Sequence, residues 1–206
     1  MSYGILGKKL GMTSLFFHDG RYLPVTVIEA GPCTITQIKT RANDGYDALQ
    51  LGFGEKKKSR VNKPLTGHYQ KSGEKCFAKI REFRIENPEE FKLGQEIKSD
   101  IFNVGERVAI SGMSKGRGFS GTIKRHGFHR GPKTHGSKNY REPGSIGQCA
   151  WPSKVFKGKR MPGRYGNTRV KTQRLEIVDI RANENLILVK GAVPGPASGT
   201  IEIYKM

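Results

Sequence analysis

The sequence predicts a mainly β protein: a small antiparallel β-barrel interrupted by a long, extended, irregular internal arm. Three observations support this prediction. Short runs rich in β-branched and aromatic residues lie on both sides of the middle of the chain, and helical hydrophobic periodicity is scarce. The middle itself combines dense positive charge with frequent glycine and proline. With 206 residues, the chain is long enough for one hydrophobic core and a large insertion.

The strand signals come in two groups. Before the arm, strands are expected at 22–29, 33–40, 48–53, 79–85 and 107–111. After the arm, strands are expected at 174–181, 186–193 and 200–204, with a hairpin turn at 182–185. Many short strands with Gly and Pro turns, and no alternation of strand and helix, favour an antiparallel barrel assembled from both sides of the arm. A β-sandwich is the alternative.

Helix signals are few. Asn87 is a good N-cap, Pro88 suits the first helical position and Gly94 suits a stop, so one short helix is expected there. A second basic run, at 56–63, lies between two predicted strands. It is interpreted either as a solvated loop or as a second contact with a nucleic-acid backbone.

Charge is the strongest functional signal. The chain has 37 Lys and Arg against 18 Asp and Glu, which gives a net charge of +19 and a pI near 10.0. Fifteen basic residues and one acid, Glu142, lie between Lys115 and Lys171, so +14 of the +19 is concentrated there. Such a charge requires a polyanionic partner. No window approaches the roughly 18 consecutive apolar residues of a membrane span, which excludes an integral membrane protein.

The arm is expected to be ordered by RNA. Glycines and prolines exclude a long regular element, and isolated apolar residues such as Phe119, Phe128 and Phe156 follow no helical or strand period. The segment is internal, and its interleaved aromatic, His and Arg residues suit base stacking as well as phosphate contact. The predicted organisation is therefore a globular domain at 1–111 and 168–206, with an RNA-binding arm at 112–167.

The residues expected to contact RNA are the arm's cations, two of its imidazoles and its indole. They are Lys115, Arg117, Lys124, Arg125, His126, His129, Arg130, Lys133, Lys138, Arg141, Trp151, Lys154, Lys157, Lys159, Arg160 and Arg164.

The sequence around each candidate enzyme motif does not fit the corresponding site. Gly116-x-Gly118-x-x-Gly121 matches the dinucleotide pattern, but 122–132 lacks a long amphipathic crossover helix and no parallel strand precedes Glu142. His126, His129, His135 and Cys149 match no standard zinc spacing, and their surroundings are cationic. No Walker A loop or pair of carboxylates appears in the arm. We therefore predict no catalytic residue, metal or cofactor, and no enzyme; a nucleotide-binding enzyme and a DNA- or membrane-binding module are the alternatives.

The cysteines and the N-terminus bear on location. Cys33, Cys76 and Cys149 are widely spaced and fit reduced thiols better than a disulfide framework. Residues 1–13 lack the apolar region of a secretory signal. Both observations predict a cytoplasmic protein.

Several stretches carry a family resemblance. They are GILGKKLGMT at 4–13, KGRGFSG at 115–121 with KRHGF at 124–128, GSIGQ at 144–148, VFKGKRMPG at 155–163 and LVKGAVPG at 188–195. In this order, from end to end, they resemble the bacterial type of the large-subunit ribosomal protein L-three family. The matches are long and in several parts, so they are far more specific than a lone glycine pattern.

The resemblance implies a translation-protein β-barrel and a structural role in the large ribosomal subunit. The arm is expected to thread between rRNA helices towards the peptidyl transferase centre and to support early ribosome assembly. The implied partners are large-subunit rRNA and neighbouring ribosomal proteins. The resemblance also makes Gln148 the candidate for methylation on its side-chain amide, with a glutamine methyltransferase as a further partner.

Overall fold

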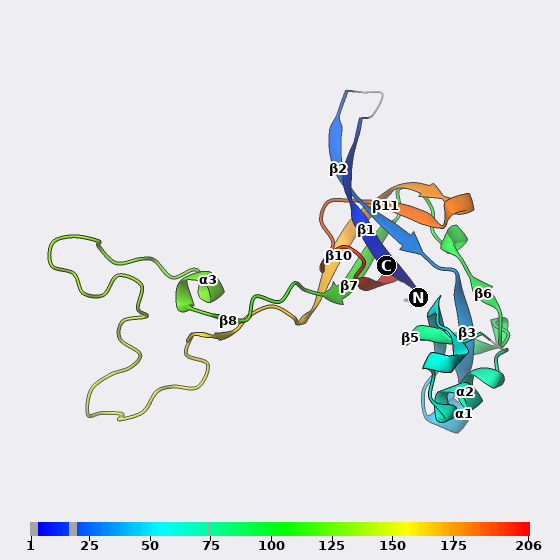
Figure 1. Ribbon diagram of the computed structural model, residues 1–206, viewed down its shortest axis with the longest axis horizontal. Helices are drawn as coiled ribbons and strands as arrows, with labels where there is room; N and C mark the ends of the chain where they lie inside the picture. The colour runs from blue at the N-terminus through cyan, green and yellow to red at the C-terminus, as the bar shows by residue number, and fades with distance from the viewer. Residues whose placement is uncertain (1–3, 17–19, 74) are drawn as a thin grey trace. The chain divides into compact units, whose positions relative to one another are not determined.

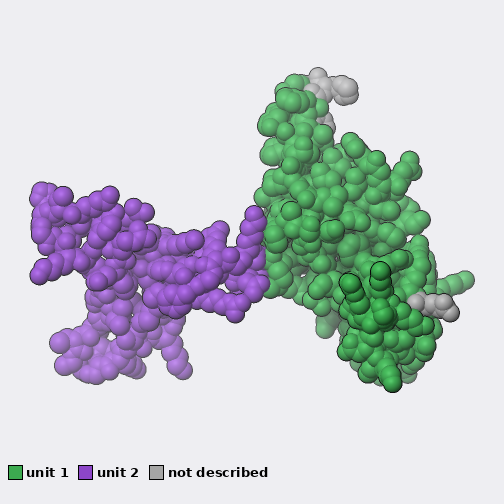
Figure 2. All heavy atoms as spheres, viewed as in Figure 1, with its two compact units in different colours: residues 1–113, 169–206 green, residues 114–168 purple. Residues whose placement is uncertain are grey.

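The computed structural model describes residues 4–16, 20–73 and 75–206, and it divides into two compact units. Unit 1 comprises Met1–Met113 and Arg169–Met206, and unit 2 comprises Ser114–Thr168 (Figure 2). Strands dominate over helices (Figure 1), and every strand pairing within the described ranges is antiparallel. The predicted mainly β, antiparallel class is confirmed.

Six strands of unit 1 close into a ring. They are β1 (Gly4–Phe16), β2 (Tyr22–Ala30), β7 (Arg107–Met113), β10 (Arg169–Arg181), β11 (Leu186–Lys190) and β12 (Thr200–Lys205). The order is β1-β12-β7-β10-β11-β2, and β2 pairs again with β1. Met113, the last residue before unit 2, pairs with Arg169, the first residue after it. The chain therefore leaves the barrel and returns to it on neighbouring strands.

A four-stranded sheet belongs to the same unit. It contains β3 (Cys33–Lys39), β4 (Ala48–Glu55), β5 (Phe77–Arg84) and β6 (Glu96–Ile97) in the order β5-β4-β3-β6. Short helical segments connect its strands: α1 (Arg41–Asp44), η1 (Lys58–Arg60), α2 (Lys63–Gln70) and η2 (Pro88–Glu90). A further turn, η3 (Ser99–Ile101), lies between β6 and β7.

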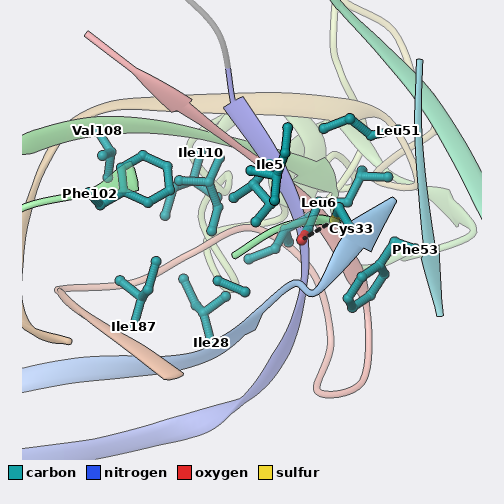
Figure 3. Close-up of a cluster of buried hydrophobic side chains, with 14 of the residues drawn as sticks. Ile5, Leu6, Ile28, Cys33, Leu51, Phe53, Phe102, Val108, Ile110 and Ile187 are labelled. Carbon is teal, nitrogen blue, oxygen red and sulfur yellow. Dashed lines mark hydrogen bonds between the residues drawn. The ribbon is translucent and has the colours of Figure 1, made fainter. Parts of the chain in front are cut away.

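One hydrophobic core joins the barrel to this sheet (Figure 3). Ile5 and Ile28 from the barrel share a buried cluster with Leu51 and Phe53 from the sheet. Burying such a side chain fully stabilises the fold by about 1.5–3 kcal/mol. Cys33 lies among them, and its Sγ donates a hydrogen bond to the Leu6 carbonyl oxygen at 3.4 Å. Burial raises the pKa of the Cys33 thiol to about 12, although the hydrogen bond to Leu6 opposes this.

The predicted strands are all present, with shifted ends. β10 begins at Arg169, five residues before the predicted start at 174, because its first residues pair with β7. β11 ends at Lys190, three residues before the predicted end. The predicted hairpin turn at 182–185 is confirmed: it contains η4 (Ala182–Glu184), and Asn185 has a left-handed φ of 53°.

The first strand, β1, was not among the predicted strands. Three glycines dilute its strand signal, but two of them have a packing role. A Cβ at Gly4 would collide with the Ile203 carbonyl oxygen on β12, and a Cβ at Gly7 would lie 2.7 Å from the Glu29 carbonyl oxygen on β2. The glycines therefore allow the neighbouring strands to approach closely.

The predicted helix between Asn87 and Gly94 is wrong. Only a single 3₁₀ turn forms, and Phe91 after it is extended and packs against the core. The Asn87 side chain donates to the Glu90 carboxylate at 3.0 Å and does not cap the backbone. Burial of Phe91 therefore outweighs the local helix signal. The interpretation of 56–63 as a loop is also incomplete, because η1 lies inside this run and α2 begins at Lys63.

Candidate nucleic-acid interface

Unit 2 has no apolar core of its own. Its buried residues are Ser120 and Thr122, which are both polar. Its largest apolar side chains lie on the surface: Trp151 is 84% exposed and Phe119 is 80% exposed. Hydrophobic burial, which stabilises unit 1, therefore contributes little to the conformation of unit 2.

Backbone pairing holds the base of unit 2 together. The strands β8 (Phe119–Ser120) and β9 (Gly163–Arg164) pair there. Further along, the Arg117 amide donates to the Tyr165 carbonyl at 2.9 Å, and the Ser114 amide donates to the Thr168 carbonyl at 2.9 Å. The Arg117 guanidinium also lies 4.7 Å from the centre of the Tyr165 ring. We call this two-stranded segment, residues 114–121 and 163–168, the stalk.

A short helix, α3 (Thr122–His126), follows the stalk and ends where Gly127 adopts a left-handed φ of 70°. Two predicted RNA-binding residues point inward from it. Arg125 Nη1 and His126 Nε2 both donate to the Met161 carbonyl oxygen, at 2.8 and 3.0 Å. Both side chains are half-buried. They therefore hold the outgoing and returning strands of unit 2 together.

Residues 127–162, which we call the distal loop, have little internal support. The Gly131 amide donates to the Tyr140 carbonyl at 2.9 Å, and the Ser145 hydroxyl donates to the Gly147 carbonyl at 2.8 Å. Every residue from 141 to 151 is exposed, including Gln148 and Trp151. The loop thus presents its polar and aromatic side chains outward and lacks a packed face.

The other predicted RNA-binding residues are on the surface. Those classed as exposed are Lys115, Arg117, Lys124, His129, Arg130, Lys133, Lys138, Arg141, Trp151, Lys154, Lys157, Lys159, Arg160 and Arg164. Some cations lie beside aromatic rings: Lys133 is 5.5 Å from the Tyr140 ring centre, and Lys154 is 5.8 Å from that of Phe156. A hydrogen bond from Arg130 lowers the pKa of the Tyr140 hydroxyl.

The electrostatic balance of unit 2 is one-sided. Its 13 basic residues face a single acid, Glu142, which gives +12 and leaves +7 for unit 1. Among the residues that the structure describes, no ion pair involves a basic side chain of unit 2. Mutual repulsion of these cations is relieved when they contact a polyanion.

The structure does not provide the context of a dinucleotide site. Gly116 and Gly118 lie in the stalk, and the helix after Gly121 has five residues before irregular chain begins. In the described part of the chain, no group of three or more His, Cys, Asp or Glu residues is placed to hold a metal. No helix of the described residues has the length and apolar character needed to cross a bilayer.

One group of polar residues in unit 1 was not predicted from the sequence. Arg81 on β5 and Arg169 on β10 both contact the carboxylate of Glu202 on β12. The only local signal is a basic residue at alternate positions, as in Lys79-Ile80-Arg81 and Arg169-Val170-Lys171. Strand alternation puts each such pair on one face, but only the pairing of distant strands brings the two pairs together.

Comparison with known proteins decides the family. The family model described as ribosomal protein L3 matches residues 82–186, a range that includes all of unit 2. The chain is also 61% identical over 206 residues to large ribosomal subunit protein uL3 of Desulfatibacillum aliphaticivorans, covering all of this chain and 98% of that protein. The chain belongs to the ribosomal protein L3 family.

Further L3 relatives match along nearly their whole length. The uL3 proteins of Desulforapulum autotrophicum and Carboxydothermus hydrogenoformans are each 57% identical over 205 residues; both alignments cover all of this chain, with 99% and 97% of the respective relative. The family resemblance and its bacterial type are therefore confirmed. As a member of the L3 family, the chain is a structural constituent of the large ribosomal subunit, which lies in the bacterial cytoplasm, and it is not an enzyme.

Proposed function

We propose that this L3 chain binds large-subunit rRNA through the extension at 112–167, that the extension reaches towards the peptidyl transferase centre, and that this binding supports early subunit assembly. One observation carries the proposal. Unit 2 combines 13 basic residues, unpaired with acids in the described chain, with the absence of a buried apolar cluster. A segment of this kind gains its ordered form by binding a polyanion.

The exposed cations act on phosphates. Each Lys or Arg that neutralises an RNA phosphate releases condensed counterions, so the affinity falls steeply with salt. Phe128, Trp151 and Phe156 stack on bases or fill spaces between RNA segments. Arg125 and His126 support this surface indirectly, since their hydrogen bonds to Met161 fasten the base of the distal loop.

The barrel serves as the base for the arm. We assign the six-stranded ring to the translation-protein type of barrel, with 1–111 and 168–206 as the globular domain. The paired residues Met113 and Arg169 give the arm two fixed attachment points on neighbouring strands. The outer surface of the globular domain contacts neighbouring ribosomal proteins.

Gln148 is the modification site in this proposal. It lies in the fully exposed run at 141–151, so its side-chain amide is open to a glutamine methyltransferase. The test is the mass of the peptide that contains Gln148, isolated from native ribosomes. Addition of one methyl group that disappears in Gln148→Asn supports the assignment, and an unmodified peptide contradicts it.

The central test removes most of the distal loop and keeps the stalk. Residues 128–160 are replaced by a short Gly-Ser linker from Gly127 to Met161, which is feasible because His126 Nε2 lies 3.0 Å from the Met161 carbonyl oxygen. A tagged copy is followed through sucrose gradients. We expect the intact chain to sediment stoichiometrically with large subunits and the shortened chain to be lost from them or to stall in precursors. Normal incorporation of the shortened chain into active subunits would contradict the proposal.

A further inference from the structure

A surface hollow of about 240 Å³ is lined only by residues of unit 1. Four strands line it with side chains at alternating positions. β5 contributes Lys79 and Arg81, β12 contributes Thr200 and Glu202, β7 contributes Ser111 and β10 contributes Arg169. A second hollow, of about 360 Å³, shares Ser111 and Arg169 and adds Lys171 and Tyr204.

Glu202 organises the cations of this hollow. It is only 8% exposed, yet its carboxylate accepts hydrogen bonds from Arg81 Nε at 3.1 Å, from Tyr204 OH at 2.7 Å and from Arg169 Nη2. Arg169 Nε also donates to the Ser111 hydroxyl at 2.9 Å. Both guanidinium groups are thereby held in defined orientations, although their side chains remain 60% and 57% exposed.

The hollow keeps more positive charge than Glu202 can balance. Arg81, Arg169 and Lys79 line it together with the single carboxylate of Glu202, and Lys171 lines the second hollow, so the two hollows together carry an excess of three positive charges. Arg81 Nη2 and Arg169 Nη1 have no hydrogen-bond partner among the described residues, so each retains donors. Lys79 has no ion pair there, and Lys171 lies 4.7 Å from the centre of the Tyr204 ring. The guanidinium groups of Arg81 and Arg169 therefore have oriented N–H donors that are available to an anion.

We propose that this hollow is a phosphate-binding site, and that its ligand is a phosphodiester of an RNA backbone. Two guanidinium groups already oriented by a carboxylate lose little side-chain entropy on binding, and their planar forks match phosphate oxygens. The site is built from four strands of unit 1, so it fixes RNA to the globular unit at a point independent of the distal loop. The assignment of RNA as the source of the phosphate rests on the proposed function.

The experiment follows the full-length chain by NMR during titration with inorganic phosphate. The reporters are the Nε–H signals of Arg81 and Arg169 and the backbone amides of Ser111 and Thr200. A saturable shift of these signals is expected. Lys79→Met with Lys171→Met should weaken phosphate binding roughly tenfold, which is about 1.4 kcal/mol, because two of the four cations are lost while both guanidinium groups stay in place. These lysines have no ion pair with Glu202 in the described chain, so the double variant leaves the carboxylate's partners in place.

Lys92→Met with Lys98→Met is the matched control, because both lysines are exposed and line neither hollow. This control should leave the phosphate titration unchanged. Absence of a saturable shift, or an equal loss in the control, would overturn the proposal.

The source of the phosphate is tested with a short, unstructured RNA oligonucleotide. We expect it to move the same Arg81 and Arg169 signals at lower concentration than inorganic phosphate does. A response to inorganic phosphate alone would overturn RNA as the ligand. The chain with residues 128–160 replaced should still show the phosphate shift, because the hollow lies outside the replaced residues. The sucrose-gradient test of the distal loop and the phosphate titration of this hollow can therefore give different answers.

Discussion

Each of the two units is stabilised internally by a different kind of interaction. Unit 1 contains a continuous core in which Ile5, Leu51, Ile110 and Ile203 are completely buried. Unit 2 buries only Ser120 and Thr122, and relies on backbone pairing at the stalk and on the contacts of Arg125 and His126 with Met161. Positive charge is therefore concentrated in the part of the chain that has no core to be disrupted by it.

The two units also differ in how their basic side chains are paired with acids. In unit 1 many cations lie beside acids, as in Lys39–Glu82 at 3.2 Å, Lys75–Glu96 at 3.0 Å and Lys205–Glu106 at 3.3 Å. Unit 2 has 13 basic residues and only Glu142 to oppose them. Unit 1 is thus expected to be stable by itself, whereas unit 2 is expected to depend on RNA.

The largest contrast is expected in cysteine reactivity. Cys33 is fully buried, its thiol pKa is raised to about 12 by burial, and Cys149 in the distal loop is exposed. In the isolated protein, Cys149 should react with a maleimide at the rate of a free thiol. Cys33 should react at least about 1,000-fold more slowly, because it becomes accessible only on unfolding. Comparable rates, measured with Cys76→Ala as background, would contradict the contrast between the units.

Stability should respond to mutation in one unit only. Ile203→Ala removes a fully buried side chain between β1 and β7 and should destabilise the isolated protein by about 2–5 kcal/mol, measured by urea unfolding. The matched change in unit 2, Trp151→Ala, should alter the free energy of unfolding by less than about 0.5 kcal/mol, because the ring is exposed. A large loss of stability from Trp151→Ala would show a packing role for the distal loop.

RNA binding should show the opposite pattern. Changing Lys154, Lys157, Lys159 and Arg160 to Gln should lower the slope of log K against log salt by about 3 for single-stranded contacts, at roughly 0.7 per lost phosphate. The free energy of unfolding should stay the same. Filter binding with a large-subunit rRNA fragment over a salt series measures the slope. Four exposed basic residues of unit 1 outside the 56–63 run, Arg41, Lys71, Lys92 and Lys98, provide the charge-matched control.

The smallest effect concerns acid stability. Partial burial raises the pKa of Glu82, but hydrogen bonds from Tyr46, Lys39 and Gln50 outweigh it, so the pKa lies below its ordinary value. A carboxyl whose folded-state pKa is lowered stabilises the fold above its unfolded-state pKa, and that contribution is lost as the pH falls through the folded-state value. The melting temperature of the isolated protein should therefore decline below pH of about 4.5. Glu82→Gln should reduce this decline, and an unchanged pH profile would refute the role of Glu82.

Prediction from sequence succeeded where the signal was local. The alternation in 33–40 and 48–53 and the turn at 182–185 have direct counterparts in the structure. Prediction failed for β1, whose glycines make sense only beside Ile203 and Glu29. It also failed for the helix after Asn87, because burial of Phe91 depends on residues distant in sequence. Within unit 2, sequence identified Arg125 and His126 as cationic or aromatic groups, but not that both donate to Met161.

Composition and motif order were enough to establish the mainly β class, the concentration of charge in one internal segment and the family. These features are encoded residue by residue, since charge, β-propensity and glycine content do not depend on which strands meet. The closure of β1 against β2 and β12, and the convergence of Arg81 and Arg169 on Glu202, were decided only by tertiary structure. The reason is physical: strand pairing brings together residues up to 200 positions apart, as with Gly4 and Tyr204, and no local pattern specifies their register.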